Sequence, residues 1–225
     1  MIFQLDKDNY LFPDATMAEE DGLLAIGGDL STGRLLQAYK RGVFPWYSED
    51  TPILWYAPHE RFVLYPSQIK VSKSMAKLLA RNTFDISFNK DFGHVMQHCS
   101  TISRRDQDGT WIVDDMLSAY KRLHDEGYAH SVEVWQSGNL VGGLYGVLVG
   151  KVFCGESMFS KVADASKAAL IYLCQNFDLE LIDCQIYSSH LASMGATTID
   201  ASFFYNKLNE QVIERNGLQK LFRYP

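Results

Sequence analysis

Three runs typical of β-strands follow one another closely between residues 131 and 156. The runs are SVEVW, NLVGGLYGVLVG and KVFCGE, and they are rich in β-branched and aromatic residues. Only short turns, at 137–139 and 150–151, separate them. Because connections this short join antiparallel strands, whereas parallel strands need a long crossover, the sequence predicts an antiparallel meander in the centre of the fold.

Helical patterns stand on both sides of this meander in the sequence. Before it, FVLY predicts a strand, Ser72 can cap a helix over SKSMAKLLA, and WIVDDMLSAYKRLHDEG predicts a helix over 111–127. After it come a helix over about 165–177, a strand in LELIDCQIY, and a last helix that contains Phe204, Leu208 and Val212. This order of elements predicts an α+β fold with a sheet of the acyltransferase type.

The first sixty residues differ from the rest of the chain. Ser31 or Thr32 can cap a short helix that ends at Gly42, and the following segment, from FPWY to WYAPHE, contains three prolines and is expected to be loop. A segment of this size cannot build a core of its own. We therefore expect a small N-terminal α/β module, residues 1–60, packed on a main domain of residues 61–225.

The composition is that of a globular protein with a sizeable core, since 47% of the residues are hydrophobic and 21% are charged. No apolar run approaches the roughly 18 to 20 residues of a membrane span, and the first residues lack the pattern of a secretory signal. The four cysteines include no CxxC pair and are expected to be reduced. These features predict a cytoplasmic protein without membrane association, with a monomer as the default.

The charge of the chain is unevenly distributed. The net charge is −6, yet residues 61–105 contain eight Lys or Arg and two Asp, which gives this segment +6 and leaves −12 for the remainder. A basic patch on an acidic protein suits a polyanion bound at one face. A solvated helix with scattered lysines is an equally good interpretation of the same residues.

The stretch FCGESMFS, residues 153–160, places three reactive side chains within four positions. Ser157 resembles half of a GxSxG nucleophile elbow, but Phe159 stands where the second glycine is needed for the tight turn. Cys154 lacks the electropositive surroundings that produce a thiolate, so it is expected to be a buried apolar residue. Glu156 is the candidate that remains.

A second polar pair lies in the apolar strand LIDCQIY. Period-two alternation places Asp183 and Gln185 on one side of this strand. A carboxylate and an amide in such a strand need partners or a cavity. They form either a satisfied hydrogen-bonded pair in the core or, together with Glu156, a functional site.

Two weaker patterns favour structural interpretations. Gly142, Gly143, Gly146 and Gly150 match neither GxGxxG nor GxxxxGK[ST], so a close approach of a backbone or of a ligand is the better interpretation. His94 and His98 have the i, i+4 spacing of metal ligands on a helix, but the neighbouring sequence offers no further ligand. An exposed helix face is therefore favoured, and no metal site is expected.

Two tryptophans occupy positions that a simple core does not require. Trp46 lies in a proline-containing loop, and Trp111 follows a polar Asp-Gly-Thr turn at the start of the predicted helix. The structural alternative is that both tryptophans simply fill the hydrophobic core. Exposed aromatic side chains beside a basic segment, however, are typical of proteins that stack on unpaired bases.

Several of these motifs together resemble one family. GVFPWY, PILWY, GTWI, HSVEVW, GGLYGV, FCGESMFS, ASK, LIDCQ and HLASMGA closely resemble, in order, the leucyl/phenylalanyl-tRNA–protein transferases. The resemblance implies a small N-terminal domain followed by a GNAT-like domain. It also implies transfer of leucine or phenylalanine, and methionine, from aminoacyl-tRNA to proteins with N-terminal arginine or lysine, which marks them for degradation. No metal or nucleotide cofactor is implied.

The resemblance also implies roles for individual residues. Trp46 and Trp111 would hold the terminal adenosine of the tRNA, and Glu156, Asp183 and Gln185 would form the reaction centre. The residues that would line the pocket for the transferred side chain are Leu144, Phe153, Leu170, Leu173 and Ile182. The residues expected to contact the tRNA backbone are Lys70, Lys73, Lys77, Arg81 and Lys90.

The chain departs from the family pattern at three positions of this implied site. The family often has methionine in place of Leu144 and an aromatic residue in place of Leu173, and it commonly has asparagine in place of Ser188. The pocket stays apolar, so these differences concern the preference between leucine and phenylalanine and one hydrogen-bonding contact.

Peptide-bond formation from an ester needs no energy source, so the chemistry depends mainly on orientation. An α-amine with a pKa near 8 loses its proton at pH 7 at a cost of about 1.4 kcal/mol, whereas holding amine and ester together contributes roughly 7 to 11 kcal/mol. A carboxylate of ordinary pKa is a poor base for an ammonium group, so Asp183 would need a strongly raised pKa. We therefore expect Asp183 and Glu156 to bind and orient the amine, with Gln185 fixing Asp183 or relaying a proton.

Two alternatives belong to other functional classes. An acetyl-CoA-dependent acyltransferase is expected to contain an [RQ]xxGx[GA] loop before a helix, and the sequence has no such motif. A non-catalytic RNA-binding protein would use the basic segment and the tryptophans, but it gives no reason for Glu156, Asp183 and Gln185 to share a site.

Overall fold

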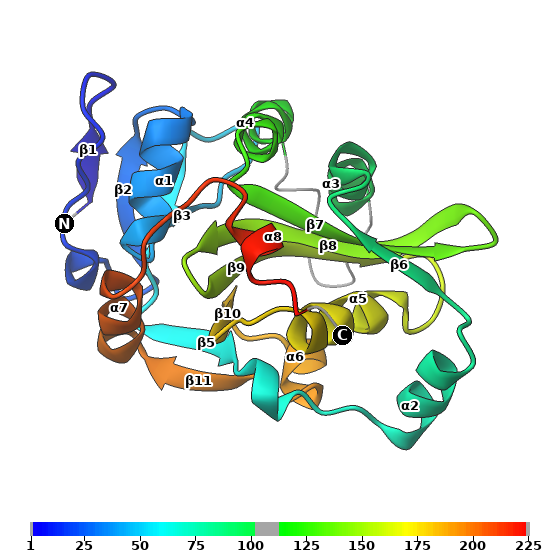
Figure 1. Cartoon of the computed structure of the whole chain (residues 1–225). Coiled ribbons are helices and arrows are strands. Elements are labelled where there is room, and N and C mark those ends of the chain that lie inside the picture. Colours follow the sequence, from blue (N-terminus) through cyan, green and yellow to red (C-terminus); the bar gives the residue numbers. More distant parts are fainter. Residues whose placement is uncertain (1, 102–112, 224–225) are drawn as a thin grey trace.

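The computed structural model describes residues 2–101 and 113–223, whose strands form two sheets (Figure 1). The smaller sheet has the order β1-β2-β4-β3, and the larger one has the order β11-β5-β10-β9-β8-β7-β6. The strands of the smaller sheet are β1 (Phe3–Leu5), β2 (Leu23–Gly27), β3 (Phe44–Pro45) and β4 (Leu54–Tyr56). The strands of the larger sheet are β5 (Glu60–Leu64), β6 (Asp85–Phe88), β7 (Ala129–Gln136), β8 (Asn139–Val149), β9 (Val152–Ser160), β10 (Leu181–Gln185) and β11 (Thr197–Asp200).

Helices cover both faces of the larger sheet. In Figure 1, α3 and α4 lie above β7–β9 and α5 lies below them, and all three helices contact these strands. The α-helices are α1 (Thr32–Lys40), α2 (Lys73–Ala80), α3 (Phe92–Thr101), α4 (Asp114–Asp125), α5 (Ala165–Asn176), α6 (Ser189–Ser193), α7 (Ala201–Asn209) and α8 (Gly217–Lys220). The prediction of a fold that mixes helices and strands is confirmed.

The central meander is confirmed as predicted. β7 pairs antiparallel with β8, and β8 pairs antiparallel with β9. Ser137 and Gly138 both have positive φ, at 52° and 77°, which is the backbone of the two-residue turns that match the twist of a hairpin. The three strands extend further than the sequence pattern indicates, and β9 reaches Ser160.

The strand after the meander closes a crossover. α5 leads from the end of β9 to β10, which runs parallel to β9 and antiparallel to β5. The predicted helix and strand are both present, but β10 ends at Gln185 and does not continue to Tyr187. Its pairing with β5 shifts register between Asp183 and Gln185. β10 therefore ends in a β-bulge in the middle of the sheet.

The segment from FPWY to WYAPHE was expected to be loop, and this expectation is wrong. It contains β3 and β4, which pair with each other, and β4 also pairs with β2. Trp55 is fully buried in the centre of this sheet and donates a hydrogen bond to the carbonyl oxygen of Gly27. Pro45 is tolerated because β3 is the edge strand.

The predicted boundaries of two helices differ from the structure. α4 begins at Asp114, with Asp114 and Asp115 in its first turn near the positive end of the helix dipole, and residues 111 and 112 of the predicted helix lie outside the described residues. α7 ends at Asn209, and Val212 lies beyond it with 68% of its surface exposed. The prediction that the last helix contains Val212 is therefore wrong.

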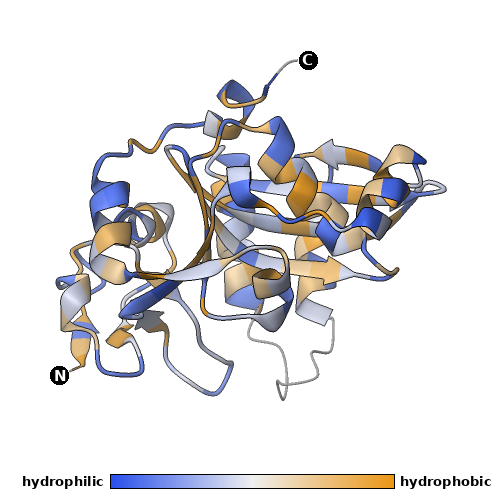
Figure 2. Ribbon diagram, turned by 90° about the horizontal axis from the view of Figure 1, so that it is seen from below, coloured by the Kyte–Doolittle hydropathy of each residue, from blue (hydrophilic) through white to orange (hydrophobic). Residues whose placement is uncertain are grey.

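Two hydrophobic clusters lie on opposite faces of the larger sheet. On β8, Tyr145 and Val147 pack in the cluster with α3, α4 and the smaller sheet, whereas Leu144 and Leu148 pack in the cluster with α5. The first cluster contains residues from both sheets, such as Trp55 and Tyr120. The smaller sheet therefore shares a core with one face of the larger one, and hydrophilic stretches lie mostly at the periphery (Figure 2).

The described ranges, 2–101 and 113–223, include no helix with the length and apolar character needed to traverse a bilayer. The four cysteine thiols are free, as expected, and three of them are buried.

Candidate active site

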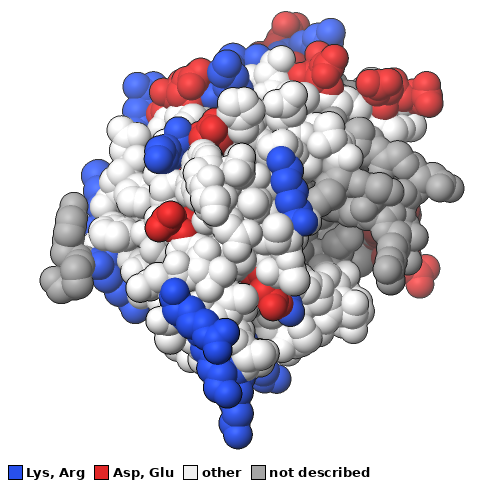
Figure 3. All heavy atoms as spheres, turned by 90° about the vertical axis from the view of Figure 1, so that its right-hand side faces the viewer, with Lys and Arg blue, Asp and Glu red and all other residues white. Residues whose placement is uncertain are grey.

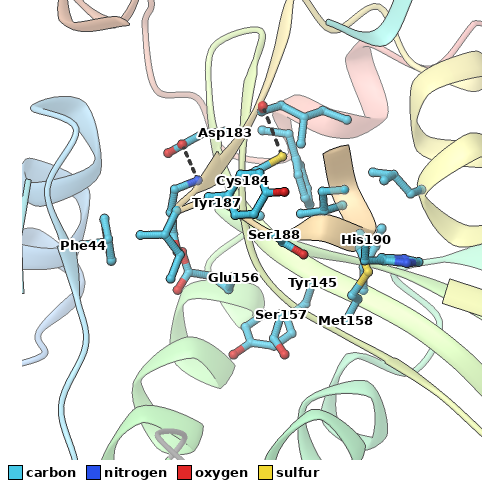
Figure 4. Close-up of a pocket in the computed structure, with 18 of the residues that line it drawn as sticks. Phe44, Tyr145, Glu156, Ser157, Met158, Asp183, Cys184, Tyr187, Ser188 and His190 are labelled. Carbon is cyan, nitrogen blue, oxygen red and sulfur yellow. Dashed lines mark hydrogen bonds between the residues drawn. The ribbon is translucent and has the colours of Figure 1, made fainter. Parts of the chain in front are cut away.

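A cavity of about 540 Å³ opens between the smaller sheet and the end of β10 (Figure 4). Its lining comes from β3 and the residue after it, from β8, β9 and α5, and from residues 182–191. Figure 4 shows Phe44 on one side of this space and His190 on the other, with Glu156 between them. Segments that are far apart in the sequence therefore meet at one site.

One side of the cavity is apolar. All five residues proposed to hold the transferred side chain line it and are buried, and they come from four different elements: Leu144, Phe153, Leu170, Leu173 and Ile182. The ring of Phe153 lies against Gly146, where a Cβ atom would come within 2.7 Å of the ring and 2.2 Å of the Cys154 carbonyl oxygen. Gly146 is therefore required by close packing, which confirms the structural reading of that glycine.

Glu156, on β9, lies at the other side of the cavity and is held by hydrogen bonds. Tyr120 of α4 donates to its Oε2 at 2.9 Å, and the side-chain amide of Gln185 donates to its Oε1 at 2.7 Å. The hydroxyl of Tyr39 on α1 hydrogen-bonds to that of Tyr120. The carboxyl group is thereby fixed in one orientation by groups from three other elements.

Asp183 is held in a different way. Arg61 of β5 donates two parallel hydrogen bonds to its carboxylate, from Nε to Oδ1 at 2.7 Å and from Nη2 to Oδ2 at 2.6 Å. The side chains of Arg61 and Asp183 are 1% and 0% exposed. Asp183 also belongs to the lining of the cavity, and its two oxygens accept hydrogen bonds from Arg61. Contact of Asp183 with the attacking amine stays a prediction.

Gln185 stands at the β-bulge that ends β10. Its φ is +64°, in the left-handed region that non-glycine residues seldom adopt. The backbone N–H donates to Asp183 Oδ1 at 2.9 Å, and the side chain reaches Glu156. The bulge therefore directs the Gln185 amide toward Glu156, and strained backbone of this kind is common at functional sites.

The two carboxyl groups differ electrostatically as well as geometrically. The pKa of Glu156 is raised to about 7, mainly by burial and to a smaller extent by the charge of Asp183, against the opposing effect of hydrogen bonds from Tyr39, Tyr120 and Gln185. Burial also raises the pKa of Tyr39 and of Tyr120 well above the usual value. Both tyrosines therefore remain protonated donors, and Glu156 titrates near neutral pH.

Aromatic and polar side chains surround the opening of the cavity. Trp46 is half-buried, lines the cavity and packs against Tyr56 with ring centroids 5.6 Å apart. Tyr187 also lines the cavity and is 69% exposed, and Ser188 follows it in the lining. Trp111, the second proposed stacking residue, lies outside the described residues.

Comparison with known proteins identifies the family. The family model described as leucyl/phenylalanyl-tRNA protein transferase matches residues 63–209, and the model for the N-terminal domain of the same family matches residues 28–59. The chain belongs to the leucyl/phenylalanyl-tRNA–protein transferase family. It is therefore an aminoacyltransferase that moves an amino acid from tRNA to protein.

Individual relatives are similar over most of their length. The leucyl/phenylalanyl-tRNA–protein transferase of Syntrophobacter fumaroxidans is 50% identical over 95% of this chain and 92% of its own. Those of Syntrophus aciditrophicus and Flavobacterium johnsoniae are 53% identical over 86% and 82%, and 49% identical over 93% and 100%, respectively. A solved protein of unknown function from Staphylococcus epidermidis has a TM-score of 0.43 at 9% identity over 79% of this chain and 68% of its own, which is too distant to support an inference.

The basic residues proposed to contact tRNA in this transferase are all exposed. Lys73 and Lys77 belong to α2, Arg81 is its C-cap, and Lys70 precedes it. Lys90 lies apart from that helix, with its ammonium group 5.1 Å from the ring centre of Trp135. Figure 3 shows Lys and Arg side chains toward the lower edge of the face on which α2 lies.

The other reactive side chains of FCGESMFS have different surroundings. Burial, and next the charge of Asp183, raise the pKa of the Cys154 thiol well above its usual value, so it stays protonated. Ser157 lies within β9, which continues to Ser160, so no strand-to-helix turn presents it as a nucleophile. Both observations agree with the sequence-based interpretation.

The two histidines of α3 have separate contacts. His94 Nδ1 lies 2.7 Å from an oxygen of Asp91, and His98 Nε2 lies 2.8 Å from Nζ of Lys161. Within residues 2–101 and 113–223, no three His, Cys, Asp or Glu side chains come together as metal ligands would.

Sequence reasoning missed three residues of the polar network. Tyr39 and Tyr120 lie in two predicted helices and were not considered as candidates, although a buried hydroxyl needs a partner. Arg61 was counted only as part of the basic segment. The signal available for it was an arginine at the beginning of the apolar strand FVLY, since a buried arginine requires a carboxylate or carbonyl partner.

Proposed function

We propose that this enzyme transfers leucine, phenylalanine or methionine to the N-terminal amine of proteins that begin with arginine or lysine, and thereby marks them for degradation. The observation that carries the proposal is one cavity in which an apolar lining faces a buried carboxyl group that titrates near neutral pH. The apolar part suits an uncharged side chain, and the carboxyl group suits a cationic amine. We further propose that the enzyme acts in the cytoplasm as a monomer, without a metal or nucleotide cofactor.

The aminoacyl group would enter with its side chain between the residues of the apolar lining. Leu144 and Leu173 are buried in this lining, and burying a Leu, Phe or Met side chain contributes about 1.5 to 3 kcal/mol. Trp46 at the opening would stack on the terminal adenosine, together with Trp111. In this proposal the ester carbonyl would lie between the apolar lining and Glu156.

The attacking amine would bind at Glu156. An N-terminal arginine or lysine brings an α-ammonium and a side-chain cation, and a carboxylate favours both electrostatically. Gln185 and Tyr120 hold the carboxyl group in place. This assignment replaces direct contact with Asp183, whose oxygens are bonded to Arg61, so Asp183 orients Gln185.

Glu156 also suits the removal of a proton from the amine. An α-ammonium has a pKa near 8, so transfer to a carboxylate with a pKa of about 7 costs about 1.4 kcal/mol, against roughly 5 kcal/mol for an ordinary carboxylate. Efficient proton transfer needs a base whose pKa lies near the working pH. The structure therefore favours Glu156 over Asp183 as the proton acceptor.

The reaction forms one bond and breaks one. The free amine attacks the ester carbonyl carbon, a C–N bond forms, and the C–O bond to the ribose breaks. The ribose oxygen leaves as a hydroxyl after it takes up the proton that the nitrogen loses during the attack, and a vicinal ribose hydroxyl would relay this proton. Orientation of the two substrates supplies the largest part of the acceleration.

The proposal also covers the division of the chain into domains and the surface that binds tRNA. We propose that residues 1–60 form the N-terminal unit and that residues 61–225 form a GNAT-like domain, which is supported by the antiparallel meander followed by α5 and the parallel strand β10. The exposed cations of α2 and its flanks, together with Lys90, would contact the tRNA backbone. Such contacts supply affinity that decreases with salt.

A transfer assay with labelled aminoacyl-tRNA tests the proposal. The enzyme is incubated with labelled Leu-, Phe- or Met-tRNA and with peptides that begin with Arg, Lys or Ala and are otherwise identical. We expect label on the Arg and Lys peptides and none on the Ala peptide or on an N-acetylated Arg peptide. Equal labelling of the Ala peptide would contradict the proposed specificity, and acetylation in a parallel reaction with acetyl-CoA would favour the rival enzyme.

Replacement of Asp183 separates catalysis from tRNA binding. Asp183→Asn leaves Arg61 without its anionic partner and weakens the acceptor for the Gln185 N–H. We expect turnover to fall about 100-fold, since small misplacements at a reaction centre have effects of this size. The dissociation constant for aminoacyl-tRNA should change much less, and near-normal turnover would contradict the role of Asp183.

A further inference from the structure

Arg61 makes hydrogen bonds along both edges of its guanidinium group. One edge donates to both oxygens of Asp183, and Nη1 donates to the carbonyl oxygen of Gly42 at 2.9 Å. Gly42 has a φ of +72°, and a Cβ atom there would come within 2.7 Å of the Tyr205 ring. A carbonyl group on a glycine where any side chain would be strained therefore fixes the far edge of the guanidinium.

Aromatic rings fix the faces of the same group. The guanidinium carbon lies 4.9 Å from the ring centre of Phe44 on β3 and 4.7 Å from that of Phe204 on α7. Planar guanidinium groups stack favourably on aromatic rings. Arg61 is thus held by the smaller sheet, by α7 and by β10, and contacts from three elements leave it one orientation.

The contacts continue from Arg61 to the reaction centre. Asp183 Oδ1, which accepts from Arg61, also accepts from the backbone N–H of Gln185. Gln185 has left-handed backbone and donates its side-chain amide to Glu156. The orientation of the Gln185 amide therefore depends on Asp183, and the orientation of Asp183 depends on Arg61.

Stability alone is a poor explanation for this buried pair. Removing two charges from water costs several kcal/mol per ion, and apolar residues of similar volume are often as stabilising as a buried ion pair. A bidentate pair does add geometric specificity that a lysine or an apolar residue lacks.

We infer that Arg61 is a positioning residue for aminoacyl transfer, which acts through Asp183 to hold the Gln185 amide against Glu156. It does not touch the substrates. The inference rests on the proposed function for its kinetic consequence, but the ordering of Gln185 is a property of the free enzyme. The ordering of Gln185 and the rate of transfer can therefore be measured separately.

The first measurement follows hydrogen exchange of the Gln185 backbone amide by NMR in the free enzyme. Arg61→Lys keeps the charge but loses the two parallel bonds, so we expect exchange to accelerate at least about 10-fold through local opening. The matched control is Arg34→Lys, because Arg34 is also fully buried, but it bonds to the carbonyls of Asp6 and Asn9 and pairs with Asp29. Unchanged protection of Gln185 in Arg61→Lys would overturn the inference, whether or not the enzyme transfers leucine to any peptide.

The second measurement separates kcat from KM in the transfer assay. We expect Arg61→Lys to lower kcat about 100-fold while KM for both substrates stays within about threefold, and Arg34→Lys to leave both within about threefold. A loss confined to KM, or a kcat near that of the wild type, would overturn the inference. Absence of transfer by the wild type would instead overturn the proposed function and leave the exchange experiment as the test of Arg61.

A neutral double variant covers the case in which Arg61→Lys does not fold. Arg61→Met combined with Asp183→Asn removes both buried charges together and is expected to fold. Its Gln185 amide should exchange at least about 10-fold faster than in the wild type, and its kcat should be as low as that of Asp183→Asn alone. Wild-type protection and turnover in this variant would show that the pair does not position Gln185.

Discussion

At the scale of single residues, the site separates two carboxyl groups by their partners. Asp183 is paired with a guanidinium group, whereas Glu156 accepts hydrogen bonds from a tyrosine hydroxyl and an amide. Partners of this kind stabilise a carboxylate less than a direct cation does. Burial therefore dominates at Glu156 and raises its pKa to about 7. Glu156 can therefore exchange a proton near neutral pH, whereas Asp183 holds Gln185 in place.

The raised pKa of Glu156 predicts a pH-dependent stability. The unfolded side chain ionises near pH 4.5 and the folded one near pH 7, so between these values the folded state binds more protons and stability falls as the pH rises. We expect the free energy of unfolding of Glu156→Gln, relative to the wild type, to increase by about 3 kcal/mol from pH 4.5 to pH 8. Urea denaturation at several pH values measures this difference, and a constant difference would contradict the assignment.

At the scale of elements, periodicity in the sequence was enough to predict the meander, α1, α2 and α5, because their apolar and polar positions repeat regularly. It did not predict β3 and β4, which are short and contain or flank prolines, and it did not predict the bulge at Gln185, because alternation assumes a regular strand. The location of Glu156 and Gln185 in one site could be suspected from their polarity. The pairing of Arg61 with Asp183 could not, because 122 residues separate them and local patterns contain no information about such contacts.

The close contact of β8 with β9 gives a prediction for this element. Gly146→Ala would place a methyl group 2.2 Å from the Cys154 carbonyl oxygen and against the Phe153 ring. Since backbone cannot move aside easily, we expect a loss of about 2 kcal/mol or more in thermal or urea denaturation, as for overpacked cores.

Gly93→Ala is the matched control for Gly146→Ala. Gly93 lies in α3, and a Cβ atom there would meet nothing within 4 Å. Because alanine has the higher helix propensity, we expect this change to be neutral or to stabilise the protein by up to about 1 kcal/mol. Equal effects of the two substitutions would contradict the packing described for Gly146.

At the scale of the whole molecule, two sheets with a shared core bring distant segments to one cavity. The smaller sheet contributes Phe44 and, just after β3, Trp46, while β9 and β10 contribute the polar network. The basic helix α2 lies at the far side of the larger sheet from β1 (Figure 1). The overall charge is −6, so tRNA should approach by this basic side and insert its acceptor end into the cavity.

The basic helix predicts how tRNA binding depends on salt. Each phosphate contact made by a lysine contributes about 0.9 to the slope of log K against log salt concentration for a duplex. We expect Lys73→Ala combined with Lys77→Ala to weaken tRNA binding and to reduce this slope by about 2 in filter-binding assays. Lys7→Ala, an exposed lysine near β1, is the control and should leave the slope unchanged.

The pH dependence of a single round of transfer tests the central claim most directly. Enzyme in excess is mixed with labelled Leu-tRNA and a saturating peptide that begins with Arg, and the rate of labelling is measured from pH 5 to pH 9 for the wild type and for Glu156→Gln. We predict a wild-type rate that rises with pH through an inflection near 7, and a variant that is about 100-fold slower or more and lacks this inflection. A variant within about threefold of the wild type, or with the same inflection, would show that Glu156 does not accept the proton.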